Sequence, residues 1–330
     1  MTSLTSPADI IRLGMSFSTA KCLLTGLRYD LFGKLADGPL DAGQVQAELG
    51  LHERGVRDFL SVLVNLGLLQ RDGQRYRNST TSERYLVRDS PSYVGGFLER
   101  ADRMLYPAWG RLDEMLRTGR PTAEADYLEM VRDPGRLRQF LGMMDALTTL
   151  IGPELAQALD WSGHRSVLDL GGARGNLVAG LVKAHPHLRG GVFDLPVMAE
   201  PFAEHMAALG LTDRVAFHGG DFFRDDLPAA EVIVVGHVLH DWAPEQCRAI
   251  VRKAYAALEP GGVLVVYDRM VDDGLTDLTN LVVSLSMMLT TEGGAEYTPG
   301  EYRSWLEEAG FRVGDARQLG ETDTLLVGIK

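Results

Sequence analysis

The strongest constraint on the fold is the alternation of short apolar runs and helical patterns in the second half of the chain, from about residue 161 onward. Most of these runs are continuously apolar, as is typical of strands that are covered on both faces. The alternation predicts a doubly wound, parallel α/β sheet with helices on both sides. The predicted strands are 166–170, 191–193, 215–217, 232–235, 263–267 and 325–329, and the predicted helices are 176–184, 198–209, 244–258 and 299–309.

The ends of three successive predicted strands carry residues that suit an adenosine ligand. The first strand leads into a glycine-rich turn at residues 171–175, where a ligand can approach the backbone closely. The second ends at Asp194, which can accept hydrogen bonds from both ribose hydroxyls. The third is followed by Asp221, an acceptor for an adenine amino group, and by Phe222, which can pack on the adenine ring. Because ligands bind at the carboxyl ends of such strands, we expect these residues to form one nucleoside site.

The charges around this turn select the kind of nucleoside. The turn lacks both the Gly-Lys-Ser/Thr of a P-loop and the Gly-x-Gly-x-x-Gly spacing of a dinucleotide site. Arg174 is the one cationic residue in the turn, whereas Asp169, Asp194 and Asp221 would repel a pyrophosphate. A cofactor that carries a sulfonium and an ammonium group matches these acids better, so the sequence predicts S-adenosylmethionine.

The first hundred residues read as helices followed by one hairpin. Apolar residues recur at helical spacing over 8–36, and a strongly amphipathic helix follows between Val56 and Val64. Asp72-Gly73 between two short runs is a hairpin signal. Helix, turn, helix and hairpin together are typical of a winged-helix unit.

A winged helix also raises the alternative of a DNA-binding regulator. The net charge of −12 opposes contact with phosphate backbones, and no run of five or more basic residues occurs. In the segment 52–58, where a recognition helix would begin, acidic and basic residues nearly cancel. We therefore expect no nucleic-acid partner and interpret the unit as a dimerisation domain whose first helices pack on a second subunit.

Other features limit where the chain acts. No apolar run reaches the roughly 18–20 residues that span a bilayer, and the N-terminus has no secretory pattern. The two cysteines, Cys22 and Cys247, are too few and too far apart for a disulfide framework or a cysteine metal cluster. We expect a cytoplasmic protein without a membrane partner.

The segment His237-Val238-Leu239-His240-Asp241-Trp242, after the fourth predicted strand, carries a family resemblance. The chain resembles the O-methyltransferases that include plant caffeate and acetylserotonin methyltransferases and bacterial tailoring enzymes of secondary metabolism. The resemblance covers nearly the whole chain. It implies a Rossmann-like class I methyltransferase sheet, S-adenosylmethionine as cofactor, a small-molecule acceptor and a homodimer. The expected domains are 1–105 for dimerisation and 106–330 for catalysis, with a helical linker at 106–160.

The same resemblance implies the catalytic residues. His240, directly before Asp241-Trp242, matches the family's general base. Asp268 matches the acid at the end of the fifth strand, and Glu296 matches the acid of a Gly-Gly-x-Glu segment. These roles are physically reasonable, because a histidine titrates near neutrality and a carboxylate can hold its ring in one tautomer. The expected reaction is methylation of a hydroxyl on a small aromatic or polyketide-like molecule.

The remaining expected contacts fall into two sets. The cofactor set is Asp169, Gly171, Gly172, Gly175, Asp194, Leu195, Asp221, Phe222 and Met144. The acceptor set is His237, Asp241, Val283, Ser286 and Met287.

Four positions depart from the family pattern. Ala173 replaces the middle glycine of the Gly-x-Gly-x-Gly turn, and Gly236 stands where a Lys or Arg often lies beside the cofactor carboxylate. We expect Arg174 to compensate for the missing cation. Asp268 is shorter than the glutamate of plant members, and His237 replaces an aromatic or aliphatic residue of the pocket.

The last departure leaves two alternatives open. His237, His240 and Asp268 match a two-histidine, one-carboxylate metal site, with Glu296 or Asp241 nearby, as would serve a metal-assisted C-methyltransferase acting on a keto acid or another enolisable substrate. The other alternative is a non-methylating member of the same fold, because fold does not fix function. Our primary expectation is an active site without a bound metal.

Overall fold

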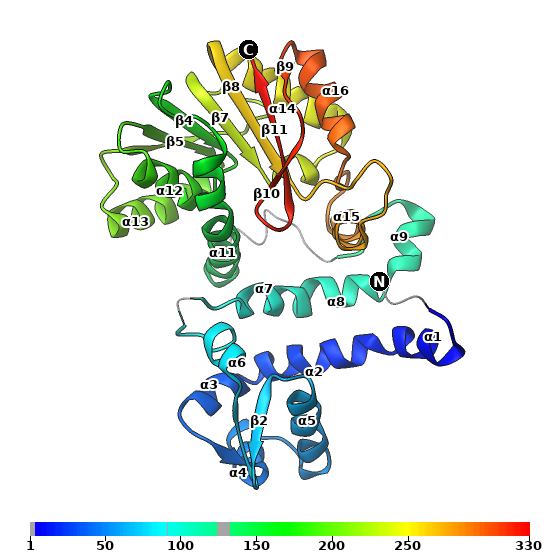
Figure 1. Cartoon of the computed structure of the whole chain (residues 1–330). Coiled ribbons are helices and arrows are strands. Elements are labelled where there is room, and N and C mark those ends of the chain that lie inside the picture. The colour runs from blue at the N-terminus through cyan, green and yellow to red at the C-terminus, as the bar shows by residue number, and fades with distance from the viewer. Residues whose placement is uncertain (1–3, 91, 124–132) are drawn as a thin grey trace. The chain divides into compact units, whose positions relative to one another are not determined.

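The computed structural model describes residues 4–90, 92–123 and 133–330, and it divides into two compact units, Met1–Tyr106 and Pro107–Lys330 (Figure 1). The part of the predicted helical linker at 124–132 lies outside the described residues. None of the described helices is both long and apolar enough to cross a membrane.

The first unit contains the predicted helices and hairpin. Its hairpin turns at Gly73, whose φ of 58° is left-handed, and a short third strand pairs with the second arm. Asp41 caps the helix that follows it through the N–H of Gln44. The elements are α1 (Pro7–Gly14), α2 (Ser16–Arg28), α3 (Leu31–Ala36), β1 (Leu40–Asp41), α4 (Ala42–Leu49), α5 (Glu53–Asn65), β2 (Leu69–Asp72), β3 (Arg75–Asn78), α6 (Thr80–Tyr85), α7 (Gly95–Arg100) and the π-helical turn η1 (Ala101–Leu105).

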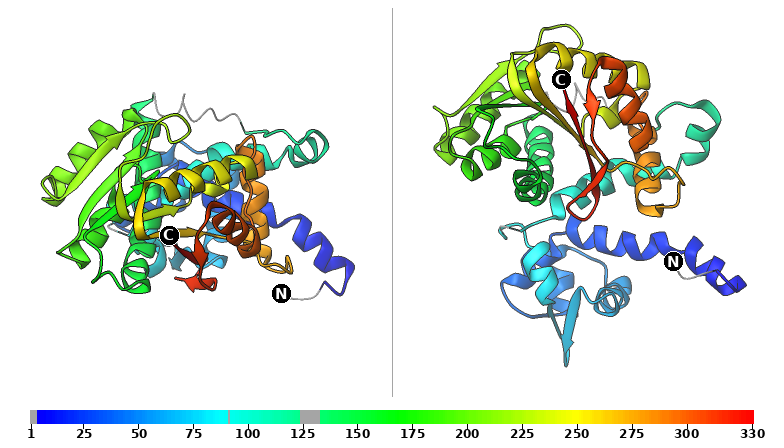
Figure 2. Two further views of the ribbon diagram at one scale, coloured as in Figure 1. Left: turned by 90° about the horizontal axis from the view of Figure 1, so that it is seen from above. Right: turned by 45° about the horizontal axis from the view of Figure 1, so that its top comes forward.

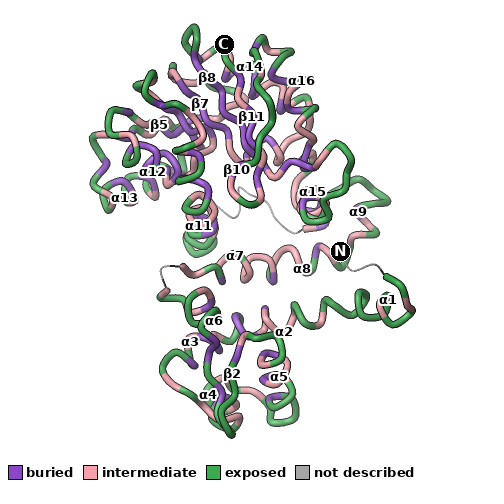
Figure 3. Tube along the Cα trace, viewed as in Figure 1, coloured by how far each residue is buried: buried purple, intermediate pink, exposed green. Residues whose placement is uncertain are grey.

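The core of this unit and its first helix differ sharply in burial. Leu31, Leu60 and Leu63 are completely buried between α3, α5 and the hairpin. By contrast, α1 and the start of α2 leave large apolar side chains in solvent, with Ile11 66% and Phe17 54% exposed (Figure 3). Large apolar side chains exposed at this density along one segment are typical of a surface that packs against a partner.

The second unit is built on one large sheet in the strand order β10-β11-β8-β7-β4-β5-β6. The five strands from β6 to β8 are parallel, as predicted, but β11 runs antiparallel to β8. The expectation of an all-parallel sheet was therefore wrong at this edge, because the chain returns through the short strand β10 into β11 rather than through a crossover helix. The strands are β4 (Ser166–Leu170), β5 (Arg189–Asp194), β6 (Val215–Gly219), β7 (Ala230–Gly236), β8 (Leu258–Asp268), β9 (Arg312–Val313), β10 (Arg317–Leu319) and β11 (Asp323–Ile329).

Helices cover both faces of this sheet (Figure 2). One face packs on α11, α12 and α13 through a buried cluster that includes Leu155, Leu181 and Met206. The other face packs on α14 and α16 through Ile250 and Trp305. The second unit's helices are α8 (Tyr106–Trp109, which begins at the last residue of the first unit), α9 (Leu112–Thr118), α11 (Pro134–Ala158), α12 (Asn176–Ala184), η2 (Pro196–Met198), α13 (Ala199–Leu209), η3 (Leu239–Asp241), α14 (Pro244–Ala257), α15 (Leu278–Thr290) and α16 (Pro299–Ala309).

Candidate active site

The strand directions bring the polar residues of the second unit to one edge of the sheet. The parallel strands β5 and β8 end at Asp194 and Asp268, and β7 ends just before His237. Since β11 is antiparallel, its first residue, Asp323, lies at this same edge, beside the pair formed by Thr324 and Asp268. Groups far apart in sequence therefore meet where open α/β sheets bind their ligands.

The glycine-rich turn after β4 exposes its backbone for close approach. Its alternate residues Gly171, Ala173 and Gly175 have left-handed φ values of 75°, 49° and 82°. Ala173 holds this conformation at a cost of about 1 kcal/mol relative to glycine. At Gly172 a Cβ would lie 2.6 Å from the carboxyl carbon of Asp169, so a larger residue could not occupy that position without displacing the acid.

Two buried acids lie beside this turn. Asp194 accepts hydrogen bonds of 2.7 Å from the N–H groups of Ala173 and Leu195. Burial raises the pKa of Asp194 to about 6 although these N–H groups lower it, and burial together with the charge of Asp194 raises the pKa of Asp169 to about 7. Neither acid has an ion pair with any described residue. These two carboxyl groups fit a ligand that brings positive charge and hydroxyl donors, as S-adenosylmethionine does.

The other predicted cofactor residues, Asp221, Phe222 and Met144, are less deeply buried than Asp169 and Asp194. Asp221 accepts from the N–H of Phe223 at 2.9 Å, so one of its oxygens already serves the local turn. Phe222 is half-buried, and its ring lies edge-on to Trp242 at a centroid distance of 5.8 Å. Met144 is half-buried on α11.

Arg174 and Gly236 are the two positions at which the sequence raised the question of a cation beside the cofactor. The guanidinium of Arg174 is engaged by Asp145, with its Nε 2.8 Å from the carboxylate, so its charge is already compensated. The absence of Lys or Arg at Gly236 has a steric reason, because a Cβ there would lie 2.0 Å from the ring of Tyr267. Tyr267 therefore fills the space into which a longer side chain would extend.

His240 is held at the sheet edge by two carboxylates. It lies in η3, just after β7, and its Nδ1 is 2.8 Å from Glu296 Oε1 and 3.4 Å from Asp268 Oδ1. Gly294 makes this approach possible, because a Cβ at Gly294 would lie 2.2 Å from the carbonyl oxygen of His240. The Gly-Gly-x-Glu segment thus packs directly on the backbone of the histidine that Glu296 contacts.

The electrostatics of His240 favour its charged form in the absence of ligands. Burial lowers the pKa of His240, but Asp268 and Glu296 outweigh burial and raise it to about 10. Because a buried carboxylate needs a donor, we assign the proton on Nδ1 to the hydrogen bond with Glu296. The other ring nitrogen, Nε2, is then the atom available to exchange a proton with an acceptor, 3.9 Å from the Asp241 carboxylate.

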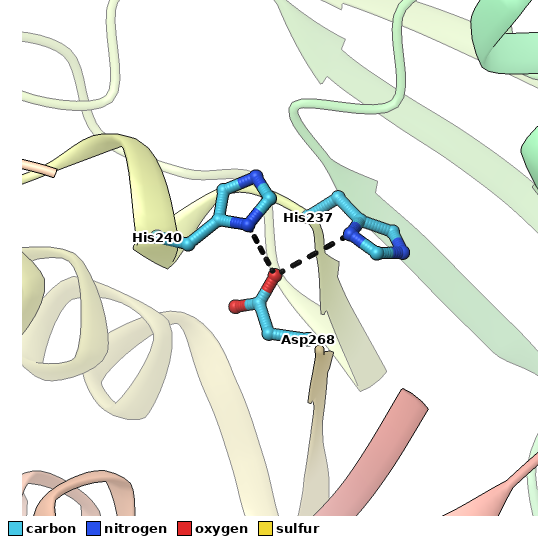
Figure 4. A group of neighbouring side chains, drawn as sticks. All are labelled: His237, His240 and Asp268. Atoms are coloured by element: carbon cyan, nitrogen blue, oxygen red, sulfur yellow. Dashed lines mark ion pairs between the residues drawn. The ribbon is translucent and has the colours of Figure 1, made fainter. Parts of the chain in front are cut away.

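His237 and His240 flank the same oxygen of Asp268 (Figure 4). The Nδ1 of His237 is 3.7 Å from Asp268 Oδ1, and its Nε2 is 2.8 Å from Asp323 Oδ1. One nitrogen of each histidine and one oxygen of Asp268 lie within 4.8 Å of one another, which is compatible with a metal site. However, the Nδ1 of His240 faces Glu296, so a metal there would displace that hydrogen bond.

Several residues that support the site were not predicted from the sequence. Asp323 contacts His237, the hydroxyl of Tyr302 donates to Asp268 Oδ2 at 2.7 Å, and Ser284 accepts from the N–H of Glu296 at 3.1 Å. No local motif marks these residues, because they join the site only through packing of the last helices and the antiparallel strand.

The predicted acceptor residues of α15 lie on one helix. Val283, Ser286 and Met287 are all partly buried there. The hydroxyl of Ser286 accepts from Trp109 Nε1 at 3.2 Å and donates to the carbonyl of Val282 at 3.0 Å. The single donor of Ser286 is thus used within the protein, and toward a polar acceptor molecule its hydroxyl could offer a lone pair.

Comparisons with known proteins assign a family to both units. Residues 109–312 match the model of the O-methyltransferase domain, and residues 11–88 match that of the O-methyltransferase dimerisation domain. The chain is 46% identical to the tetracenomycin polyketide synthesis 8-O-methyl transferase TcmO of Streptomyces glaucescens, over 100% of this chain and 98% of that protein. It is 39% identical to the N,N-dimethyltransferase OxyT of Streptomyces rimosus, over 98% and 96%. The crystal structure of human N-acetylserotonin methyltransferase in complex with SAM matches with a TM-score of 0.88 at 29% identity, over 100% and 99%.

Proposed function

Because this chain belongs to the family of S-adenosylmethionine-dependent O-methyltransferases, we propose that it methylates a hydroxyl of a small aromatic or polyketide-like molecule, with His240 as the general base. The observation that carries this proposal is the placement of His240 between Glu296 and Asp268, at the same sheet edge as the glycine turn and Asp194. The names of two relatives support the acceptor class: TcmO and a 3-hydroxy-5-methyl-1-naphthoate 3-O-methyltransferase of Streptomyces sahachiroi, which is 34% identical.

The residues of this chain divide the work between binding and proton transfer. Asp194 accepts hydrogen bonds from the ribose hydroxyls, and the acids near the glycine turn favour a cationic ligand there. The bound cofactor supplies a methyl group on a sulfonium. His240 Nε2 takes the proton of the acceptor hydroxyl as its oxygen becomes the nucleophile, while Glu296 keeps the ring in the tautomer with Nδ1–H.

The high pKa of His240 makes it a strong base that must lose a proton before it acts. In the protein without ligands the imidazolium is the stable form at neutral pH, since the pKa is about 10. A positive charge bound nearby disfavours the imidazolium and lowers the pKa of His240. With a sulfonium bound at the sheet edge, His240 would therefore lose its proton more readily and reach the neutral form that accepts a proton.

The direct experiment is a screen for formation of S-adenosylhomocysteine with hydroxynaphthoates and polycyclic phenols as acceptors. Each positive acceptor is tested again with its hydroxyl blocked and with an amine in place of the hydroxyl. Turnover that requires the free hydroxyl supports the proposal. Transfer to the amine alone, or to carbon after the hydroxyl is blocked, contradicts it.

The metal-assisted C-methyltransferase remains a second candidate because of the three convergent atoms of His237, His240 and Asp268. The hydrogen bond from His240 to Glu296 favours the general-base alternative. Elemental analysis of the purified protein and assay after dialysis against a chelator separate the two. Turnover that falls on chelation and returns with one divalent metal would support the second candidate.

The exposed apolar surface of α1 and α2 supports the proposal of a homodimer through the N-terminal domain. A second copy of this surface would bury side chains such as Ile11 and Phe17, which are more than half exposed in the single chain. Sedimentation velocity on the purified protein measures the oligomeric state directly.

A further inference from the structure

The His237–Asp323 contact lies next to the proposed base but is not part of the hydrogen bond that holds it. His237 follows β7 in a left-handed conformation with a φ of 52°, which is rare for a residue with a side chain. This backbone places the ring between two strand ends, with Nε2 2.8 Å from Asp323 Oδ1 and Nδ1 3.7 Å from Asp268 Oδ1. Strain of this kind persists where the surroundings over-determine it.

Asp268 depends on the two histidines for its charge. It is fully buried, and its Oδ2 accepts from the hydroxyl of Tyr302, but its Oδ1 has no hydrogen-bond donor among the described residues. Two imidazole nitrogens face this oxygen, that of His240 at 3.4 Å and that of His237 at 3.7 Å. A buried carboxylate without compensation takes up a proton rather than remain charged. Removing the imidazole of His237 would therefore leave this oxygen facing the ring nitrogen of His240 without its second nitrogen neighbour.

Asp323 contacts Nε2 of His237, the ring nitrogen opposite the one that faces Asp268. The carboxyl group of Asp323 is nearly inaccessible, and its second oxygen accepts from the hydroxyl of Thr322 at 2.7 Å. The imidazole of His237 holds the pKa of Asp323 below its usual value although burial raises it, so Asp323 is a carboxylate that accepts from the His237 ring. Asp323, His237, Asp268 and His240 then form one chain of alternating carboxyl and imidazole groups at the ends of β11, β8 and β7.

We propose that His237 and Asp323 are a second histidine–carboxylate pair that positions the Asp268 carboxylate beside His240 during methyl transfer. Both are positioning residues, because they act through Asp268. This proposal rests on the proposed general-base role of His240. The other titratable and charged groups that face the cluster are Asp169, Asp241, Cys247, Tyr267, Arg269, Glu296 and Tyr302.

A double-mutant cycle separates positioning from general structural support. D323N preserves the shape of the side chain but removes its charge. E321Q, at an exposed position in the turn just before β11, is the matched control. We expect D323N to lower kcat roughly tenfold with little change in the acceptor KM, whereas E321Q leaves both unchanged. In the D268N background, D323N should have almost no further effect, since its route through Asp268 is already lost. Equal losses in both backgrounds would overturn the proposal.

Two further variants test the contacts of His237 one at a time. H237N retains a donor near the position of Nδ1 and suits the left-handed backbone, but it is too short to reach Asp323. H237Q places a donor near the position of Nε2 but none toward Asp268. If His237 acts through Asp268, H237N should retain a larger share of the parent kcat than H237Q. The reverse order would contradict the proposal. Thermal unfolding of each variant identifies losses that arise from misfolding.

A spectroscopic readout makes the proposal testable without an acceptor. Full-length protein labelled with [15N]histidine and saturated with S-adenosylhomocysteine gives ring nitrogen signals for His240, which H240A identifies. We expect D323N to shift these signals and E321Q to leave them in place. Unshifted His240 signals in folded D323N would reject the coupling through Asp268. If turnover of H240A equals that of the parent enzyme, by contrast, the general-base proposal fails and the coupling can still stand.

Discussion

Because the pKa of Asp194 is raised, we expect cofactor affinity to depend on pH in a range where most carboxylates do not titrate. Burial raises its pKa to about 6 despite the two N–H groups that donate to it. Only the ionised carboxylate can accept from both ribose hydroxyls while it retains those two backbone hydrogen bonds. As the pH falls through 6, Asp194 becomes protonated and affinity declines; above that value affinity is constant with respect to this group.

The magnitude follows from the position of the pKa. Each pH unit below 6 weakens binding by about tenfold if binding requires the ionised acid, so about tenfold is lost between pH 7 and 5. Asp169, whose pKa is raised to about 7 by burial and by Asp194, adds about a further fiftyfold over the same interval if it must also be ionised. S-adenosylhomocysteine is the suitable probe, because its own groups do not titrate between pH 5 and 7.5.

The assay is isothermal titration calorimetry of S-adenosylhomocysteine from pH 5.0 to 7.5, in buffers that differ in ionisation enthalpy. D194N removes this group's share of the pH dependence, and D226N, at an exposed position, is the control that retains it. Release of protons on binding below pH 7 is expected for the parent protein. An affinity that stays constant over this range in folded protein would refute the role of Asp194.

Three further predictions concern the base, the sheet and the dimer. The acid limb of the kcat/KM profile should have its midpoint above the ordinary histidine value of 6.5, because carboxylates raise the pKa of His240, and E296Q should move it down; a midpoint unchanged by E296Q contradicts this. G236A should destabilise the fold by about 1–3 kcal/mol through collision with Tyr267. Thermal unfolding should show that G236A costs less stability in a Y267A background than in the parent protein. I11E should shift sedimentation toward the monomer with the catalytic unit folded, and an unchanged dimer argues against the α1 surface as the interface.

The elements that the sequence predicts best are those whose signals are local. β4, α12 and α16 begin and end where the apolar pattern and the caps place them. Asp194 could be assigned to a strand end because it closes a continuous apolar run, and the family resemblance implied the same placement for Asp268. Their convergence then follows from the parallel order of the strands.

The residues that sequence analysis missed depend on long-range geometry. Asp323 precedes the predicted last strand by two residues, and only the antiparallel direction of β11 brings it to the ligand edge. The clash between Gly236 and Tyr267 is a contact across neighbouring strands, which no single segment encodes. The pairing of Arg174 with Asp145 likewise depends on how α11 packs against the turn.

The most direct test of the general-base proposal is single-turnover methyl transfer by H240A and the parent enzyme, both saturated with S-adenosylmethionine and with a phenolic acceptor identified in the screen. The proposal predicts a rate for H240A that is lower by roughly 10²-fold or more, with unchanged affinity for S-adenosylhomocysteine. Equal rates for the two proteins would contradict it and would leave the orientation of the two substrates as the main source of catalysis.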